Sequence, residues 1–341
     1  RMIAENTLAK NKVLYIGHAI AAVAANNPAI AEEALKSIEV EYEILPAVVS
    51  LKEAMAKNAP LLHENLTTVF REDRFSAGED TGEKSNIAGH IQFQRGNIEQ
   101  GFKEADLIIE REFNTETVHQ GYIEPFASTA DWNNEGRLTI WTCTQGSFNV
   151  RSITANILDI PESTVKVIPT EIGGGFGGKG VGYLEPVVAI LSKKSGLPVK
   201  IIMSRKEVFE GTGPTSATYS KCKIGVTSKG IITAGYHYMA YEAGAFPGSP
   251  VGGGAMTSFG PYKIENFLVD GYDVVCNKQK VQAYRAPGQP TAAFAVECII
   301  DEIAEKLNMD PLDLRLLNVA RKGDRMPSGP VLPEVGTEEI E

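Results

Sequence analysis

Apolar and polar residues along the chain follow two different periods, which indicate strands mixed with helices. Alternation and short apolar runs predict strands over residues 13–23, 38–42, 107–113, 123–132, 138–142, 165–168 and 267–275. Apolar spacings of three and four predict helices from residue 28, over 51–59, 150–157, 184–191 and 292–307, and from residue 310. Turn residues at 133–136 and 227–230 are typical of β-hairpins. Because the two kinds of element are mixed and no repeat appears, we expect an α+β fold.

The N-terminal part of the chain is expected to be separate from the rest. Residues 12–46 have a strand, helix, strand pattern, with Asn27 as a helix cap and Pro28 at the first helical position. The stretch 65–86 carries mixed charges and few apolar residues, so we interpret it as a domain boundary. The opening Arg1-Met2 runs almost at once into a strand, which suggests a processed chain or a fragment.

A glycine-rich stretch, residues 173–179, lies between the strand at 165–168 and the helix at 184–191. It has five glycines in seven residues and reads Gly-Gly-Gly-Phe-Gly-Gly-Lys. Without Cβ atoms, the backbone can adopt positive φ and let a ligand, above all a phosphate, approach successive N–H groups. Phe176 is then the bulky side chain that can touch this ligand. A second glycine cluster at 248–260 is expected, on composition, to be a flexible surface loop.

Three interpretations fit the first glycine stretch. The Gly-Gly-Lys end resembles a P-loop, but Gly180 stands where a magnesium-binding Ser or Thr belongs. The glycines also match the dinucleotide pattern, yet residues 199–202 hold no acid for a ribose hydroxyl about twenty residues on. A glycine turn packed under a strand is the third. We favour ligand contact because the stretch is long and ends in Lys179.

Composition narrows the class of function. The chain has 341 residues, 43% hydrophobic and 22% charged, and its net charge of −10 follows from 33 basic and 43 acidic residues. Without a basic run, nucleic acid and anionic membrane surfaces are not expected as partners. No apolar stretch of about eighteen residues and no signal peptide is present, so we expect a cytoplasmic protein.

The cysteines and histidines do not predict a metal site. The four cysteines have no C-x-x-C spacing, and the five histidines form no metal-binding pair. We therefore expect no zinc or iron-sulfur site in this chain and interpret the cysteines as small buried hydrophobes.

Four motifs occur in order: residues 118–125 (Val-His-Gln-Gly-Tyr-Ile-Glu-Pro), 144–146 (Thr-Gln-Gly), 173–179 and 283–288 (Ala-Tyr-Arg-Ala-Pro-Gly). In this order and spacing they resemble the molybdenum-binding subunit of the xanthine dehydrogenase and aldehyde oxidase family, the molybdenum hydroxylases. The resemblance covers nearly the whole chain.

The resemblance implies a division of the chain. Residues 1–65 resemble the later part of the family's α/β hammerhead domain, 66–104 are expected to be a linker, and 105–341 resemble the first half of its molybdopterin-binding domain. The second half of that region, with its glutamate general base, is expected outside this chain. The chain is then either one of two polypeptides of a split subunit, as in nicotinate dehydrogenase, or a piece of a longer protein.

The resemblance also assigns site residues. Gln145 matches a glutamine over the molybdenum, and Phe176, with the amides of Gly175 and Gly177, matches the loop against the pterin. Arg285 matches an arginine beside the cofactor or substrate, so that Gln145 and Arg285 are the catalytic candidates. Further cofactor contacts are expected at Ala286, Gly254 and Ala255. The metal is held by the pterin dithiolene, so no protein ligand is expected.

The chemistry of individual residues refines this assignment. A dinucleotide pyrophosphate needs N–H groups and local cations, for which Lys179 and Arg285 are candidates. Glu124, next to Pro125 in a strand-like context, is interpreted as structural. Purine-oxidising relatives carry a glutamate and an arginine where this chain has Gly180 and Gly254, so purine oxidation is not expected.

The function implied is oxidation of an aldehyde or N-heteroaromatic compound with water-derived oxygen, at a molybdenum with a sulfido or selenido ligand. The cofactor is expected as molybdopterin cytosine dinucleotide, with 2Fe-2S and FAD subunits and the second half of the molybdenum subunit as partners. A non-catalytic scaffold subunit of the same fold is the alternative, and a nucleotide triphosphatase a distant third.

Overall fold

The computed structural model describes residues 2–72 and 76–333, which divide into two compact units. The first unit comprises Arg1–Ala47, Val118–Thr215 and Asn277–Arg285, and the second Val48–Thr117, Ser216–Cys276 and Ala286–Glu341. No described helix is both long and apolar enough to cross a membrane.

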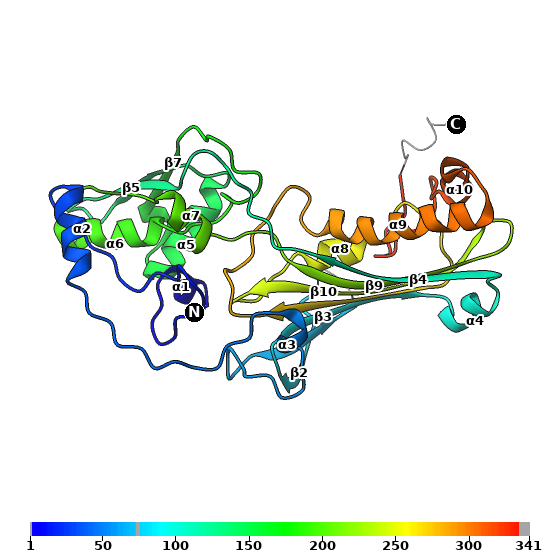
Figure 1. The fold of residues 1–341 in the computed structure, drawn as a ribbon. Helices are drawn as coiled ribbons and strands as arrows, with labels where there is room; N and C mark the ends of the chain where they lie inside the picture. The colour runs from blue at the N-terminus through cyan, green and yellow to red at the C-terminus, as the bar shows by residue number, and fades with distance from the viewer. Residues whose placement is uncertain (1, 73–75, 334–341) are drawn as a thin grey trace. The chain divides into compact units, whose positions relative to one another are not determined.

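The first unit is built on a four-stranded sheet of order β7-β6-β5-β8 (Figure 1). Its strands are β5 (Ala127–Trp132), β6 (Leu138–Thr142), β7 (Val165–Pro169) and β8 (Val199–Ile202). Its helices are α1 (Met2–Thr7), α2 (Pro28–Lys36), α5 (Ser147–Leu158), the 3-10 turn η1 (Glu162–Thr164), α6 (Glu185–Ser195) and α7 (Arg205–Gly211).

The core of this sheet forms where alternate strand residues meet helix faces. Leu138 and Ile140 of β6 are fully buried, together with Val188 of α6 and Ala155 of α5. The predicted hairpin at 133–136 is present and joins β5 to antiparallel β6. Parallel pairing of β6 with β7 then delivers the chain into the glycine stretch that precedes α6.

The N-terminal segment of the first unit differs from its prediction. Helix α2 begins at Pro28 as expected, and the Asn27 side chain accepts a hydrogen bond from the N–H of Ile30 (3.0 Å). The stretches 13–23 and 38–42, however, are not strands. A strand forms only when a neighbour pairs with its N–H and C=O groups, and no described strand lies beside them.

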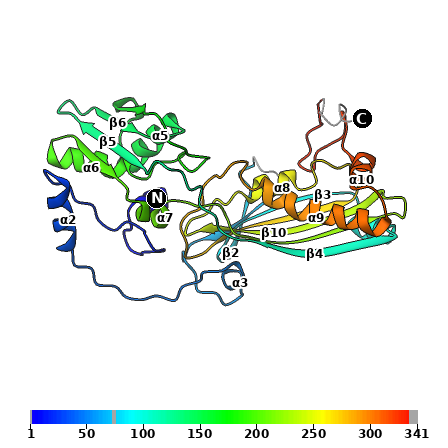
Figure 2. The ribbon, with the colours of Figure 1, turned by 45° about the horizontal axis from the view of Figure 1, so that its top comes forward.

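The second unit is a mixed seven-stranded sheet of order β2-β1-β3-β11-β10-β9-β4 (Figures 1 and 2). Its strands are β1 (Thr67–Arg71), β2 (Glu79–Lys84), β3 (Ile87–Arg95), β4 (Leu107–Thr115), β9 (Thr218–Val226), β10 (Ile232–Gly244) and β11 (Phe267–Val275). Its helices are α3 (Leu51–Ala54), α4 (Ile98–Lys103), α8 (Val251–Thr257), α9 (Gln289–Leu307) and α10 (Pro311–Asn318).

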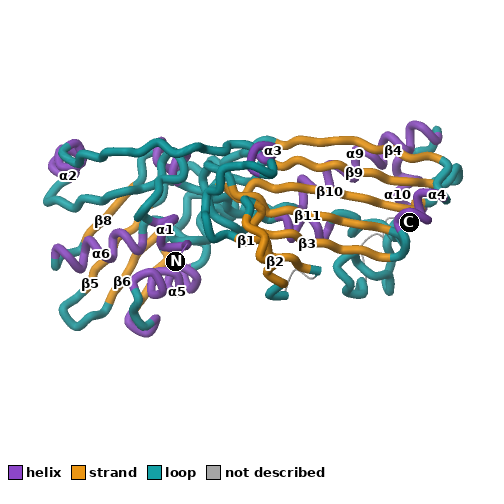
Figure 3. Tube along the Cα trace, turned by 90° about the horizontal axis from the view of Figure 1, so that it is seen from below, coloured by secondary structure: helices purple, strands orange, loops and turns teal. Residues whose placement is uncertain are grey.

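Period-2 alternation divides the side chains of this sheet between two cores. Helices α8 and α9 run along one face (Figure 1), where Ile224 of β9 and Met239 of β10 pack with Ile299 of α9. On the other face, seen from below in Figure 3, Ala240 and Val274 pack with α3. The predicted hairpin at 227–230 joins β9 to β10, and Ile232 pairs with Val226.

Residues 66–104, expected as a linker, instead carry β1, β2, β3 and α4. All six residues of β2 are exposed and polar or glycine, because this strand lies at the sheet edge. An edge strand of that kind has no apolar period, which is why the sequence pattern did not indicate it.

One of the cysteine predictions is also wrong. Cys143, Cys222 and Cys276 are buried, but Cys298 is exposed on α9.

The buried imidazole of His237 makes stability depend on pH. His237 on β10 is fully buried, Ser258 Oγ lies 2.6 Å from Nδ1, and burial lowers the pKa of the ring from 6.5 to about 3. Between these values the unfolded chain binds one more proton than the folded chain. The free energy of unfolding should therefore fall as pH falls, by up to about 1.4 kcal/mol per pH unit.

This prediction is checked by urea unfolding of wild type and His237→Gln between about pH 7 and about pH 4. The stability difference between the two proteins should shrink on acidification. Gln94→Ala, at an exposed residue whose side chain does not titrate, is the matched control and should keep a constant difference from wild type. A constant difference for His237→Gln would contradict the prediction.

Candidate functional site

The glycine stretch 173–179 runs in the first unit between β7 and α6, and it passes close to neighbouring backbone and side chains. A Cβ on Gly177 (φ 103°) would lie 2.6 Å from the carbonyl oxygen of Ala283. A Cβ on Gly175 would lie 2.6 Å from Gln145 Oε1. Only glycine permits both approaches, so the glycines are required by the path of the loop.

Gln145 follows β6 and fastens the loop from one side. Its side-chain Oε1 accepts hydrogen bonds from the N–H groups of Gly177 (3.1 Å) and Lys179 (3.2 Å). Its own N–H donates to the carbonyl of Lys179 (2.9 Å). Two N–H donors require an oxygen, which assigns the orientation of the amide. The Nε2 group is left as a donor without an acceptor among residues 2–72 and 76–333.

Three successive N–H groups of the loop, those of Gly174, Gly175 and Phe176, have no hydrogen-bond acceptor in the described part of the chain. Phe176 has a left-handed backbone (φ 51°), and the residue is 53% exposed. The amide of Gly177, expected as a cofactor contact, is already bonded to Gln145. The loop therefore offers three amides and one aromatic ring to an acceptor-rich ligand.

Arg285 lies next to the loop through its backbone. Its N–H donates to the carbonyl oxygen of Phe176 (2.9 Å), and both Arg285 (φ 26°) and Ala286 (φ 58°) are left-handed. The side chain is exposed, and its guanidinium forms no ion pair or hydrogen bond with a described residue. A planar cation in this state can bind a phosphate or carboxylate through two donors.

Lys179 does not provide the ligand-facing cation that the sequence suggested. Its side chain is 0% exposed, and its Nζ forms an ion pair with Glu124 Oε2 at 2.6 Å. The same Nζ lies 4.8 Å from the ring centre of Tyr122 and 5.6 Å from that of Phe126. The sequence could not show that the Lys179 side chain is buried, because its three neighbours, in residues 122–126, lie far earlier in the chain. Glu124 has the structural contacts expected for it.

Gln120 lies in the 118–125 motif, but the sequence did not indicate a role for it. It is buried, and its Nε2 donates to the carbonyls of Gly213 (3.1 Å) and Ala283 (2.9 Å). A Cβ on Gly178 would lie 2.9 Å from its amide carbon. Gln120 thus supports the segment before Arg285 and the end of the glycine loop. A single glutamine within a motif is too weak a signal to predict this supporting role.

The remaining predicted contacts, Gly254, Ala255 and Ala286, belong to the second unit. Residues 251–257 form α8 and not a flexible loop, because Gly254 packs where a Cβ would lie 2.6 Å from Tyr241 Oη. Ala255 is fully buried in the core under α9, whereas Ala286 is exposed. Of the predicted residues, the structure therefore brings together Gln145, Gly175, Phe176, Gly177 and Arg285.

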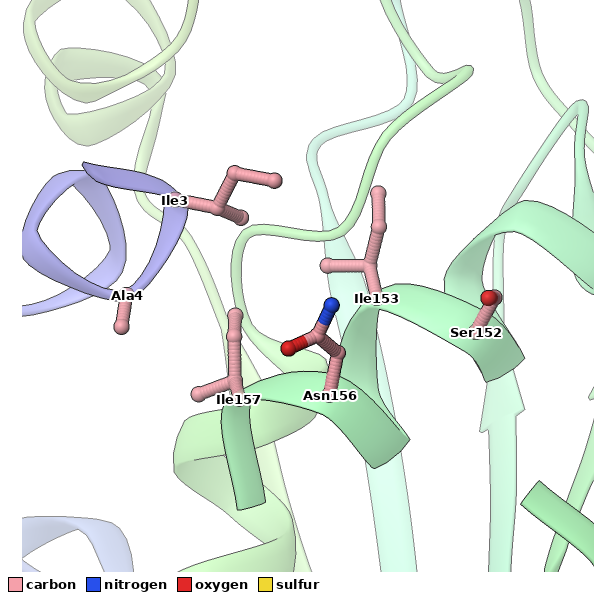
Figure 4. A pocket seen from close by; sticks show the side chains of 6 residues that line it. All are labelled: Ile3, Ala4, Ser152, Ile153, Asn156 and Ile157. Carbon is pink, nitrogen blue, oxygen red and sulfur yellow. The ribbon is translucent and has the colours of Figure 1, made fainter. Parts of the chain in front are cut away.

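Two cavities of modest size lie elsewhere. One, of about 290 Å³, lies between α1 and α5, where Ile3, Ile153 and Ile157 line the opening (Figure 4). The other, of about 320 Å³, lies in the second unit beside Arg71, His90 and the start of α8. Neither contains a residue predicted for the site.

The residues around the loop fit a cofactor that carries its own metal ligands. No group of three or more His, Cys, Asp or Glu side chains within the described residues is placed to hold a metal ion. The loop instead supplies N–H donors, a free amide donor from Gln145 and a guanidinium. These groups suit a pterin or a phosphate rather than a bare cation.

Comparison with protein families gives two matches. The molybdopterin cofactor-binding domain matches residues 79–319. The a/b hammerhead domain of aldehyde oxidase and xanthine dehydrogenase matches residues 2–46. The domain boundaries expected near residues 65 and 105 stay predictions.

Curated relatives and solved structures agree with these families. The large molybdopterin subunit of nicotinate dehydrogenase from Eubacterium barkeri is 30% identical, over 96% of this chain and 73% of that protein. The molybdenum-binding subunit of xanthine dehydrogenase from Escherichia coli is 29% identical, over 96% of this chain and 42% of that protein. Quinoline 2-oxidoreductase from Pseudomonas putida 86 superposes with a TM-score of 0.83 at 26% identity, over 96% of this chain and 41% of that one.

The close approach of the backbone at Gly177 can be tested by a substitution that adds one methyl group. Gly177→Ala places a Cβ against Ala283, whereas Gly136→Ala adds one at a turn with φ 79° and nothing within 4 Å. The control should lose only the cost of a left-handed alanine, about 1–2 kcal/mol. Gly177→Ala should lower the free energy of unfolding by more, measured in urea. Equal losses would show that the loop relaxes freely.

The chain spans 42% of the Escherichia coli relative and 73% of the nicotinate dehydrogenase subunit, so it corresponds to part of each. The family match covers most of the chain and includes the glycine loop, Gln145 and Arg285. By sequence, family model and fold, the chain belongs to the xanthine dehydrogenase and aldehyde oxidase family of molybdenum hydroxylases, and it corresponds to part of the family's molybdenum-binding subunit.

Proposed function

We propose that this chain is the cofactor-binding part of a molybdenum hydroxylase that oxidises an aldehyde or N-heteroaromatic substrate with water-derived oxygen. The observation that carries the proposal is the arrangement at the glycine loop. Three free amides, from Gly174 to Phe176, lie beside Gln145, whose Nε2 is left as a donor because its Oε1 is bonded to the loop. Such preorganised donors hold an oxygen-rich group without reorganisation.

Each residue of the site has a distinct role in this proposal. The loop amides bind cofactor oxygens, and the exposed ring of Phe176 contacts the flat pterin and excludes water. Gln145 Nε2 donates a hydrogen bond to an oxygen of the bound cofactor. The guanidinium of Arg285 holds a phosphate or a substrate oxyanion. When bound, the molybdenum cofactor supplies the two-electron oxidation, which no side chain can perform.

The complete enzyme needs parts that we place outside this chain. A carboxylate general base must lie within hydrogen-bond reach of the reacting oxygen, and we assign it to the second half of the molybdenum subunit. We propose 2Fe-2S and FAD subunits as electron acceptors and the cytosine dinucleotide as the form of the cofactor. Gly180 argues against purine substrates, and a cytoplasmic location stays a prediction.

The first test is the molybdenum content of the complex purified from its native source, with whatever copurifies. We expect about one molybdenum per chain by elemental mass spectrometry, and cytidine monophosphate on acid hydrolysis. Gln145→Ala should reduce this content, because it removes both the Nε2 donor and the acceptor for two loop amides.

Gln94→Ala, at an exposed glutamine of β3, is the matched control and should keep the wild-type content. A complex that contains a folded second half but no molybdenum would favour the scaffold subunit instead. Adenosine or guanosine monophosphate on hydrolysis would overturn the cytosine assignment alone.

A further inference from the structure

We infer that Glu124 and Lys179 form a clamp that closes the glycine loop at both ends and thereby positions its three free amides. Both are positioning residues, because the Lys179 ammonium is fully buried and the Glu124 carboxylate is bonded to it and to the loop. The part of this inference that concerns the cofactor rests on the proposed function. The part that concerns the loop does not.

One carboxylate oxygen makes both bonds of the clamp. Glu124 Oε2 accepts from the N–H of Gly173 at 2.9 Å and from Lys179 Nζ at 2.6 Å. These are the first and last residues of the seven-residue loop. A Cβ on Gly173 would lie 2.6 Å from Glu124 Cβ, so glycine allows this close approach. The N–H of Glu124 also donates to the carbonyl of Gly173 (3.1 Å).

The environment of Lys179 makes the closure firm. Its ammonium is buried beside two aromatic rings, and Glu124 is its ion-pair partner among the described residues. A buried cation with one carboxylate cannot leave that partner without stranding its charge. The backbone of Lys179 is also fixed, because its carbonyl accepts from Gln145 N (2.9 Å) and Thr144 Oγ1 (3.1 Å).

Closure at both ends determines what lies between. Gly174, Gly175 and Phe176 occupy the centre of the loop, and glycine has the largest conformational entropy of any residue. Without fixed ends, their N–H groups would point in many directions. When Glu124 holds both ends, each of the three N–H groups keeps a fixed direction before any ligand binds. The lysine that resembles a phosphate ligand in the sequence therefore acts through its buried ion pair with Glu124.

The first experiment compares Lys179→Met with wild type in the purified complex. Hydrogen exchange of the peptide covering residues 173–179 reports loop order, and molybdenum content reports binding. We expect exchange about tenfold faster and molybdenum content reduced about tenfold, because a hydrogen bond to a charged group is lost. Lys221→Met is the matched control, since Lys221 forms a partly exposed ion pair with Glu110, and it should change neither readout.

The second experiment separates positioning from simple stability. Glu124→Gln strands the buried charge of Lys179, whereas Glu124→Gln with Lys179→Met removes both charges. The double variant should melt at a higher temperature than Glu124→Gln. Its loop should still exchange rapidly and its molybdenum content should stay low. Glu162→Gln, at an exposed ion pair with Arg151, is the control for the carboxylate change.

Slow loop exchange in Lys179→Met, or full molybdenum content in the double variant, would overturn the clamp. Absence of molybdenum from the wild-type complex would overturn the proposed function and leave hydrogen exchange to decide the clamp alone. The two failures are therefore distinguishable.

Discussion

The side-chain oxygen of Gln145 determines the geometry of the candidate site. By accepting from two backbone N–H groups of the glycine loop, it fixes the loop and the orientation of its own amide at once. The N–H groups of Gly174, Gly175 and Phe176, which have no acceptor among the described residues, are then left for a ligand. A site of this kind depends on unsatisfied backbone groups, which are costly when buried and become stabilising when a ligand accepts from them.

Much of the local structure could be predicted from the sequence, because short-range chemistry specifies it. The Asn27 cap with Pro28 and the two hairpins at 133–136 and 227–230 are examples that the structure confirms. The family resemblance, carried by four motifs, is confirmed by the family models. Such signals are contained within a few consecutive residues, so they do not depend on the rest of the fold.

What could not be predicted depends on partners far along the chain. The strand pattern at 38–42 is present, but a strand needs a neighbour that the pattern does not specify. The polar edge strand β2 has the neighbour without the pattern. The glycines at 253 and 254 suggested flexibility, yet they allow Pro287 and Tyr241 to approach α8 closely. Lys179 is a residue type that often binds phosphate, but here its side chain is buried against three residues of the stretch 122–126.

The extended segment after α2 bears on whether identical molecules of this protein pair with one another. Residues 39–45 make no backbone hydrogen bond within the described part, and Ile44 is 93% exposed. An unpaired apolar ribbon normally invites pairing between identical molecules. Here every second residue from Glu39 to Glu43 is a glutamate, so two copies stacked in register would place like charges opposite one another. Pairing of this segment with the same segment of a second molecule is therefore disfavoured. A strand without acidic residues would pair with it more readily.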